Sequence, residues 1–169
     1  MSRSSRCAAA MLLLASLAAA GGCEGKSRVV NDSTTEHNKS LARRWIEHGF
    51  NERNLDVVDE LFAADFAVNG QVVGVTGLKE SMRRHINGFP DLHVTIDAVI
   101  AEGNFVGIWY SAKGTHRGEF EAIPPTGKRV KWSGFDLLTI EVGRISAARF
   151  LSDHLGLLTQ LGATLTLPH

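Results

Sequence analysis

The chain has 169 residues, with 18 Lys and Arg balanced by 18 Asp and Glu, and only 2 Cys. A formal net charge of zero, with both signs scattered along the chain, gives no basic patch for nucleic acid, so no nucleic-acid partner is expected. Hydrophobic residues at 44% and charged residues at 21% exclude global disorder and collagen-like repeats. The length favours one folded domain.

The first 22 residues resemble a bacterial export signal. Arg3 and Arg6 precede an apolar run over 8–20, which is too short to span a bilayer but typical of a signal peptide. Small residues then lead to Cys23, similar to a bacterial lipobox. Residues 1–22 are therefore interpreted as a lipoprotein-type signal peptide, and Cys23 as the lipidation site of an exported protein, on the outer side of the cytoplasmic membrane or in the periplasm. The alternative is cleavage after Ala20, which leaves a free thiol.

Removal of residues 1–22 leaves a single cysteine, so the mature protein cannot form an intrachain disulfide. Its stability then depends on a hydrophobic core. Residues 23–35 are small and polar without periodicity, which is typical of a flexible tether. The folded domain is expected over residues 36–165, and the membrane is expected as a partner only through the lipid anchor.

Three amphipathic helices are predicted in the first half of the domain. Apolar residues recur at helical spacing over 36–50. Asn54 is a candidate N-cap for a second helix, with an apolar stripe over 55–62. A short strand is expected at 66–68, and a third helix is expected over 77–89, where a proline follows.

Beyond residue 90 the apolar period changes to two, which indicates strands with one buried face. Four strands are expected, at 92–100, 106–116, 130–140 and 144–152. Turns at Gly103 and Gly143 join the outer pairs, and a longer excursion centred on Pro124 and Pro125 joins the middle pair. A closing helix capped by Asp153 follows. The fold class is therefore α+β, with N-terminal helices packed on a curved antiparallel sheet, a short C-terminal helix and a concavity for a small ligand.

Five segments in order resemble one protein family. They are LDVVDELF at 55–62, FPDLH at 89–93, GTHRGEF at 114–120, IPPTGK at 123–128 and DHLGLL at 153–158. Together they are similar to the SnoaL-like polyketide cyclases, also called ester cyclases. This resemblance covers roughly residues 41–162. It implies a nuclear transport factor 2-like cone fold with an internal pocket, and a cofactor-free intramolecular aldol condensation of a polyketide ester.

Two residues are candidates for catalysis. Asp136 shares strand parity with Trp132 and Leu138, so its carboxyl is expected among apolar side chains, where burial raises a carboxyl pKa toward the range useful for proton transfer. The alternative is a structural carboxylate bonded to the backbone or to an arginine. By position, the resemblance makes His116 the pocket histidine, an electrophilic or positioning donor for an Asp136 base. The alternative is an exposed histidine near a strand end.

Three further residues are expected in the ligand pocket. Tyr110 shares the buried face of its strand, and Trp132 shares the parity of Asp136. Asn69 stands where many members of the resembled family carry a histidine. No pair of the seven histidines combines helical spacing with a metal-binding signature, so no metal is expected. The run Arg83-Arg84-His85 is interpreted as a solvated helix face.

A simple hairpin centred on the proline pair would place Asp136 opposite Ser111, with His116 about 17 Å away along the strand, so direct contact is not expected from regular pairing. The alternatives are that the two residues face one cavity from different depths, or that the excursion shifts the register. Two functions remain open. The chain is either a cofactor-independent acid/base enzyme for a small hydrophobic carbonyl compound, or a non-catalytic binding or interaction module that uses the concavity for a small hydrophobic ligand or the sheet for self-association. Family analogy adds a homodimer through the open sheet face as an expectation.

Overall fold

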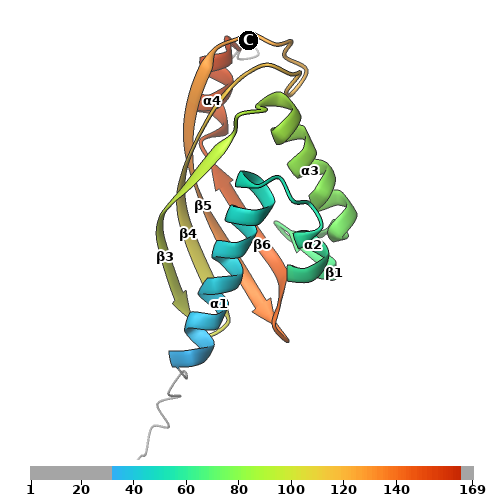
Figure 1. Ribbon diagram of the computed structural model, residues 1–169, viewed down its shortest axis with the longest axis vertical. Helices are drawn as coiled ribbons and strands as arrows, with labels where there is room; N and C mark the ends of the chain where they lie inside the picture. Colours follow the sequence, from blue (N-terminus) through green and yellow to red (C-terminus); the bar gives the residue numbers. More distant parts are fainter. Residues whose placement is uncertain (1–31, 165–169) are drawn as a thin grey trace, which may run out of the picture.

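The computed structural model describes residues 32–164 (Figure 1). The expected signal peptide over 1–22, the lipidation site Cys23 and the first part of the expected tether lie outside the described residues, as does residue 165. Within the described part of the chain, no helix is both long enough and apolar enough to cross a membrane.

Four helical segments lie in the first half of the described chain. They are α1 (Asp32–Arg44), the π-helix η1 (Trp45–Asn51), α2 (Val57–Leu61) and α3 (Gly74–Gly88). The helix predicted over 36–50 is present, but α1 begins at Asp32, four residues before the expected start of the domain, and the chain changes to a π-helix at Trp45. Asn54 accepts a hydrogen bond from the backbone N–H of Asp56 at 3.0 Å, just before α2.

The rest of the described chain forms a six-stranded sheet and one more helix. The elements are β1 (Phe62–Val68), β2 (Gln71–Val72), β3 (His93–Glu102), β4 (Phe105–Thr115), β5 (Arg129–Glu141), β6 (Arg144–Ser152) and α4 (His154–Leu161). The strand order is β2-β1-β6-β5-β4-β3, and every pair is antiparallel except β1 with β6. Gly103 and Gly143 adopt positive φ at the predicted turns. Asp153 caps α4 by accepting a hydrogen bond from the Gly156 N–H at 2.8 Å.

The core lies between the sheet and the helices that cover one of its faces (Figure 1). Even-numbered residues of β5 from Val130 to Ile140 are buried, whereas the odd-numbered residues of the strand are half-buried or exposed. This is the alternation that a period of two predicts. The expected α+β class, with helices packed on a curved sheet and a short closing helix, is confirmed.

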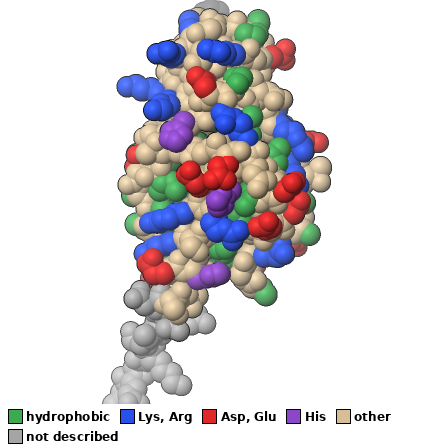
Figure 2. All heavy atoms as spheres, in the orientation of Figure 1, with side chains coloured by type: hydrophobic (Ala, Val, Ile, Leu, Met, Phe, Trp, Pro, Cys, Tyr) green, Lys and Arg blue, Asp and Glu red, His purple; other side chains and the backbone are tan. Residues whose placement is uncertain are grey.

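Charges are mixed on the surface. Figure 2 shows Lys and Arg interspersed with Asp and Glu over the face that is viewed in Figure 1. Exposed ion pairs also join helices to one another, such as Arg44 with Glu60 at 3.0 Å and Lys79 with Asp59 at 2.6 Å. Because exposed pairs contribute little to stability, the apolar core holds the helices on the sheet.

The middle hairpin does not have the register of a simple hairpin centred on the proline pair, because the excursion shifts it. Ser111 pairs with Ser133, and Asp136 pairs with Ile108, a shift of three residues from the expected pairing of Asp136 with Ser111. The turn lies at 121–122, where both residues have positive φ and the flanking residues 120 and 123 exchange two backbone hydrogen bonds. The proline pair therefore follows the turn instead of forming its centre.

Candidate functional site

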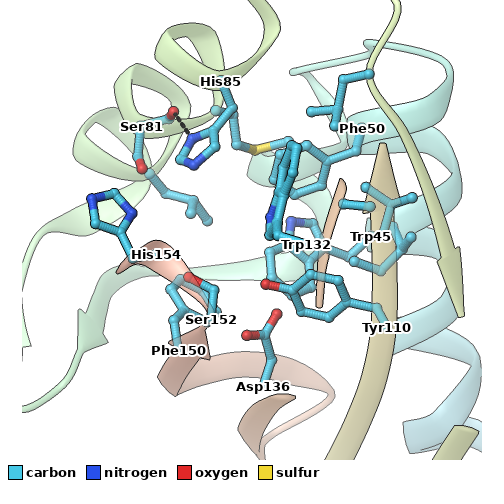
Figure 3. A pocket seen from close by; sticks show the side chains of 16 residues that line it. Trp45, Phe50, Ser81, His85, Tyr110, Trp132, Asp136, Phe150, Ser152 and His154 are labelled. Atoms are coloured by element: carbon cyan, nitrogen blue, oxygen red, sulfur yellow. Dashed lines mark hydrogen bonds between the residues drawn. The ribbon is translucent and has the colours of Figure 1, made fainter. Parts of the chain in front are cut away.

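A cavity of about 210 Å³ lies between the helices and the inner face of the sheet. Side chains from η1, α3, β3, β4, β5, β6 and the start of α4 line it, so nearly every layer of the domain contributes. Figure 3 shows Trp45, Phe50 and Tyr110 on one side of the cavity, and Ser81, His85 and His154 on the other, with Asp136 at its base. Aromatic and aliphatic side chains dominate this lining, which suits an apolar ligand.

Asp136 is the buried acid of the cavity. The side chain lies on the inner face of β5, is 4% exposed, and has Ile108 and Phe150 as its cross-strand neighbours. Its Oδ1 has no hydrogen-bond partner among the described residues, and no ion pair to this carboxyl occurs within 32–164. Burial raises the pKa of Asp136 to about 8. The structure thus places this carboxyl in the apolar surroundings expected from strand parity.

Tyr110 and Trp132 also line the cavity. Tyr110 is the cross-strand partner of Gly134, and a Cβ on that glycine would overlap the tyrosine hydroxyl, so the glycine gives the phenol its room. Burial, and secondarily the nearby Asp136 carboxylate, raise the pKa of Tyr110, which therefore remains a neutral hydrogen-bond donor. Trp132 packs its ring against Phe89 at a centroid distance of 5.4 Å and forms part of the wall.

Two histidines that the sequence analysis did not assign to the pocket line it, His85 on α3 and His154 at the start of α4. The expectation of a solvated face over 83–85 is correct for the two arginines, which are exposed, and wrong for His85. Helical spacing could have indicated that His85 faces the cavity. His85 stands three residues after Met82 and seven after Leu78, and both of these residues are buried and line the cavity.

The hydrogen bonding of His85 fixes its chemistry. Its Nδ1 lies 2.9 Å from the carbonyl oxygen of Ser81. Since a carbonyl can only accept, Nδ1 carries the proton and Nε2 of the neutral ring is an acceptor. Burial lowers the pKa of His85, against a smaller opposing contribution from the Ser81 hydrogen bond, so the neutral form is favoured.

His116 does not line the cavity. It is completely buried at the end of β4, which also excludes the alternative of an exposed histidine. Its Nδ1 accepts a hydrogen bond from the Thr126 N–H at 3.2 Å, and the ring packs against Phe89 at 5.4 Å. Burial lowers the pKa of His116. His116 is eight residues beyond Ile108, the partner of Asp136, a path of about 26 Å along the strand.

Asn69 also lies outside the cavity. It is exposed in the turn between β1 and β2 with a φ of 51°, a conformation that asparagine tolerates well. Its Oδ1 accepts a hydrogen bond from the Phe150 N–H at 3.2 Å. Of the five predicted catalytic and pocket residues, the structure brings together Asp136, Tyr110 and Trp132.

Within residues 32–164, no group of three or more His, Cys, Asp or Glu side chains is arranged to hold a metal ion. Three side chains of the cavity wall can take part in acid/base chemistry or hydrogen bonding. Asp136 can exchange a proton, Tyr110 can donate a hydrogen bond, and His85 can accept one through Nε2.

Comparison with known proteins identifies the family of the chain. The family model for the SnoaL-like polyketide cyclases matches residues 40–161. The chain belongs to this family. No functionally curated protein matches the chain significantly.

Solved structures of similar fold come from several bacteria. A protein of Jannaschia sp. CCS1 classed as a SnoaL-like polyketide cyclase is 25% identical, with a TM-score of 0.71 over 78% of this chain and 95% of that one. TsrD from Streptomyces laurentii is also 25% identical, with a TM-score of 0.71 over 76% and 97% of the two chains. AclR from Streptomyces galilaeus, classed as a hydroxylase, is 24% identical, with a TM-score of 0.70 over 79% and 86%, which shows a shared fold only.

Proposed function

We propose that the protein is a cofactor-independent acid/base enzyme that acts on a small hydrophobic carbonyl compound, in an intramolecular reaction of the aldol type. The observation that carries the proposal is the unpartnered, buried carboxyl of Asp136 in an apolar cavity. Membership of the SnoaL-like family supports the reaction class. Two other polar side chains of the cavity wall, those of Tyr110 and His85, orient the ligand.

The proposed reaction balances without a cofactor. The Asp136 carboxylate removes a proton from the carbon next to a carbonyl group, and the C–H electron pair moves toward the carbonyl oxygen to form an enolate. The enolate carbon then attacks a second carbonyl of the same molecule and forms a C–C bond. The resulting alkoxide takes the proton back from Asp136. A pKa of about 8 makes the ionised carboxyl a stronger base than an exposed aspartate.

Proton abstraction can be tested without the natural substrate. α-Tetralone, a bicyclic ketone with slowly exchanging α-protons, is incubated with the protein in D2O, and loss of the α-proton signal is followed by proton NMR. We expect exchange above the buffer rate, rising with pH as Asp136 ionises and levelling above a pH of about 8. Asp136→Asn should lower the rate by at least about 100-fold.

The matched control is Asp65→Asn, because Asp65 is an exposed carboxylate on β1 outside the cavity. This variant should exchange the α-protons at the wild-type rate. Unchanged exchange in Asp136→Asn would remove Asp136 as the base. Saturable binding of α-tetralone by wild type and Asp136→Asn alike, with no exchange in either, would instead favour the non-catalytic binding protein.

We also propose that the domain acts outside the cytoplasm on a lipid anchor at Cys23. The support is the sequence alone, in which small residues precede Cys23 after an apolar run. Expression of the full chain in a bacterium fed an alkyne-tagged palmitate should label the protein, and Cys23→Ser should abolish the label. Equal labelling of both chains, or of neither, would contradict the anchor.

A further inference from the structure

A residue of the cavity wall carries a second unpartnered polar atom, the indole Nε1 of Trp45. Trp45 is 2% exposed and lines the cavity together with Asp136. Its Nε1 has no hydrogen-bond partner among the described residues. An indole N–H can only donate, and a buried donor without an acceptor is unfavourable. A ligand oxygen in the cavity would relieve this cost.

Aromatic neighbours fix the orientation of the Trp45 ring. The indole stacks on Phe150 at a centroid distance of 5.5 Å and an interplanar angle of 21°, and it meets the edge of Phe62 at 5.6 Å. Phe150 is also the cross-strand partner of Asp136 on β6. Trp45 and Asp136 therefore both neighbour Phe150, which also lines the cavity.

The π-helix contributes to this arrangement. Trp45 is the first residue of η1, and the wider π turn brings residue i+5, Phe50, next to it, with ring centroids 5.9 Å apart. Gly49 leaves room for Met82, since a Cβ there would lie 2.8 Å from Cε of Met82, whereas its distance of 3.4 Å from Cδ1 of Trp45 would be an ordinary contact. The donor is thus held rigidly before any ligand arrives, as electrostatic stabilisation of a transition state requires.

We infer that Trp45 is a catalytic hydrogen-bond donor, whose indole N–H binds the ligand carbonyl oxygen and stabilises the enolate formed when Asp136 removes the adjacent proton. The inference rests on the proposed function and extends it. The carbonyl oxygen and the α-proton of one ligand are separated by only three bonds, so a donor and a base on two wall residues that both neighbour Phe150 suit them. Trp45 thus supplies the hydrogen-bond donor that was expected from His116, because His116 lies outside the cavity.

Infrared spectroscopy of bound α-tetralone tests the hydrogen bond directly. In the wild-type protein the carbonyl stretch should fall below its frequency in hexane, because a hydrogen bond weakens the C=O bond. Trp45→Phe removes the N–H and keeps an aromatic ring, so the stretch should return toward the hexane value. Affinity for α-tetralone should fall about fivefold to tenfold, whereas affinity for tetralin, which lacks the carbonyl, should not fall by this factor.

Two further variants separate the N–H from packing. Replacement of Trp45 by 3-benzothienylalanine keeps the size of the ring and removes only the donor. The carbonyl stretch of α-tetralone bound to this variant should also return toward the hexane value, and this result does not depend on the folding of Trp45→Phe. Trp109→Phe, on the exposed face of β4, should keep the wild-type spectrum. In the exchange assay, loss of the donor should slow α-proton exchange about 100-fold.

The outcomes separate this inference from the proposed function. No saturable binding of α-tetralone by the wild-type protein, or an equal carbonyl frequency in wild type and in the benzothienyl variant, would overturn the role of Trp45. A shifted carbonyl stretch that depends on Trp45, without any α-proton exchange, would support Trp45 as the ligand-binding donor and remove Asp136 as a base.

Discussion

The two faces of the same strands differ sharply in what their side chains do. On the inner face of β5, Trp132 and Asp136 are buried under the helices. On the outer face, Trp109 is 52% exposed and Leu151 is 67% exposed. Both groups of residues contain a tryptophan and a carboxylate. In contrast to Asp136, the carboxylate of Asp97 is exposed and accepts a hydrogen bond from a serine hydroxyl at 2.6 Å. The comparison teaches that strand parity, through burial, determines whether a tryptophan or a carboxylate belongs to the site.

The largest expected contrast is in packing. Trp132→Ala should lower the free energy of unfolding by about 3–5 kcal/mol, because it leaves a void beneath the helices. Trp109→Ala should change it by about 1 kcal/mol or less, since its ring is half in solvent. Urea denaturation at low protein concentration measures both values. Equal losses for the two variants would break the distinction between the faces.

A second contrast concerns charge and pH. The pKa of Asp136 is about 8 in the folded protein, above its ordinary value of 3.8. Between these values the folded protein holds a proton that the unfolded chain has released, so the free energy of unfolding falls as pH rises from about 4 toward 8. Asp136→Asn should remove this part of the slope and raise the melting temperature at pH 8 by several degrees. The control Asp97→Asn should keep the wild-type slope, and a slope shared by all three proteins would contradict the burial of the charge.

The smallest effect is expected from the outer face, where we predict self-association of two copies. Lys113 and Lys131 lie side by side at one end of this face, and Glu102 and Glu141 lie at the other. Two copies packed in antiparallel orientation would bring lysines against glutamates around Trp109 and Leu151, with Arg149 on the same face. Trp109→Lys should shift sedimentation velocity profiles toward the monomer and leave α-tetralone binding unchanged. A wild-type protein that stays monomeric at high concentration would contradict this face as an interface.

Much of the fold follows from local patterns in the sequence. The alternation of apolar residues along β5 predicts both the strand and the inward orientation of Asp136, because burial on one face follows directly from a period of two. The cap at Asp153 and the turns at Gly103 and Gly143 depend on single residues with specific backbone chemistry, and each is present.

Other features depend on contacts that no local pattern encodes. The turn at 121–122 uses two residues that are not glycine at positive φ, so the proline pair gave the wrong centre and the wrong register. The cavity role of Trp45 depends on a change from α-helix to π-helix, which has no distinct apolar period. The two arginines before His85 favour a solvated helix face, although the spacing of His85 from Met82 matches the buried face of α3.

The parallel pairing of β1 with β6 has a consequence for how the protein is made. Phe62 pairs with Ile145, so the first strand of the sheet joins a partner that the ribosome delivers more than eighty residues later. Pairings this distant in sequence form late and slowly. The cavity therefore closes only after β6 has been synthesised, because Phe150 and Ser152 of this strand also line it.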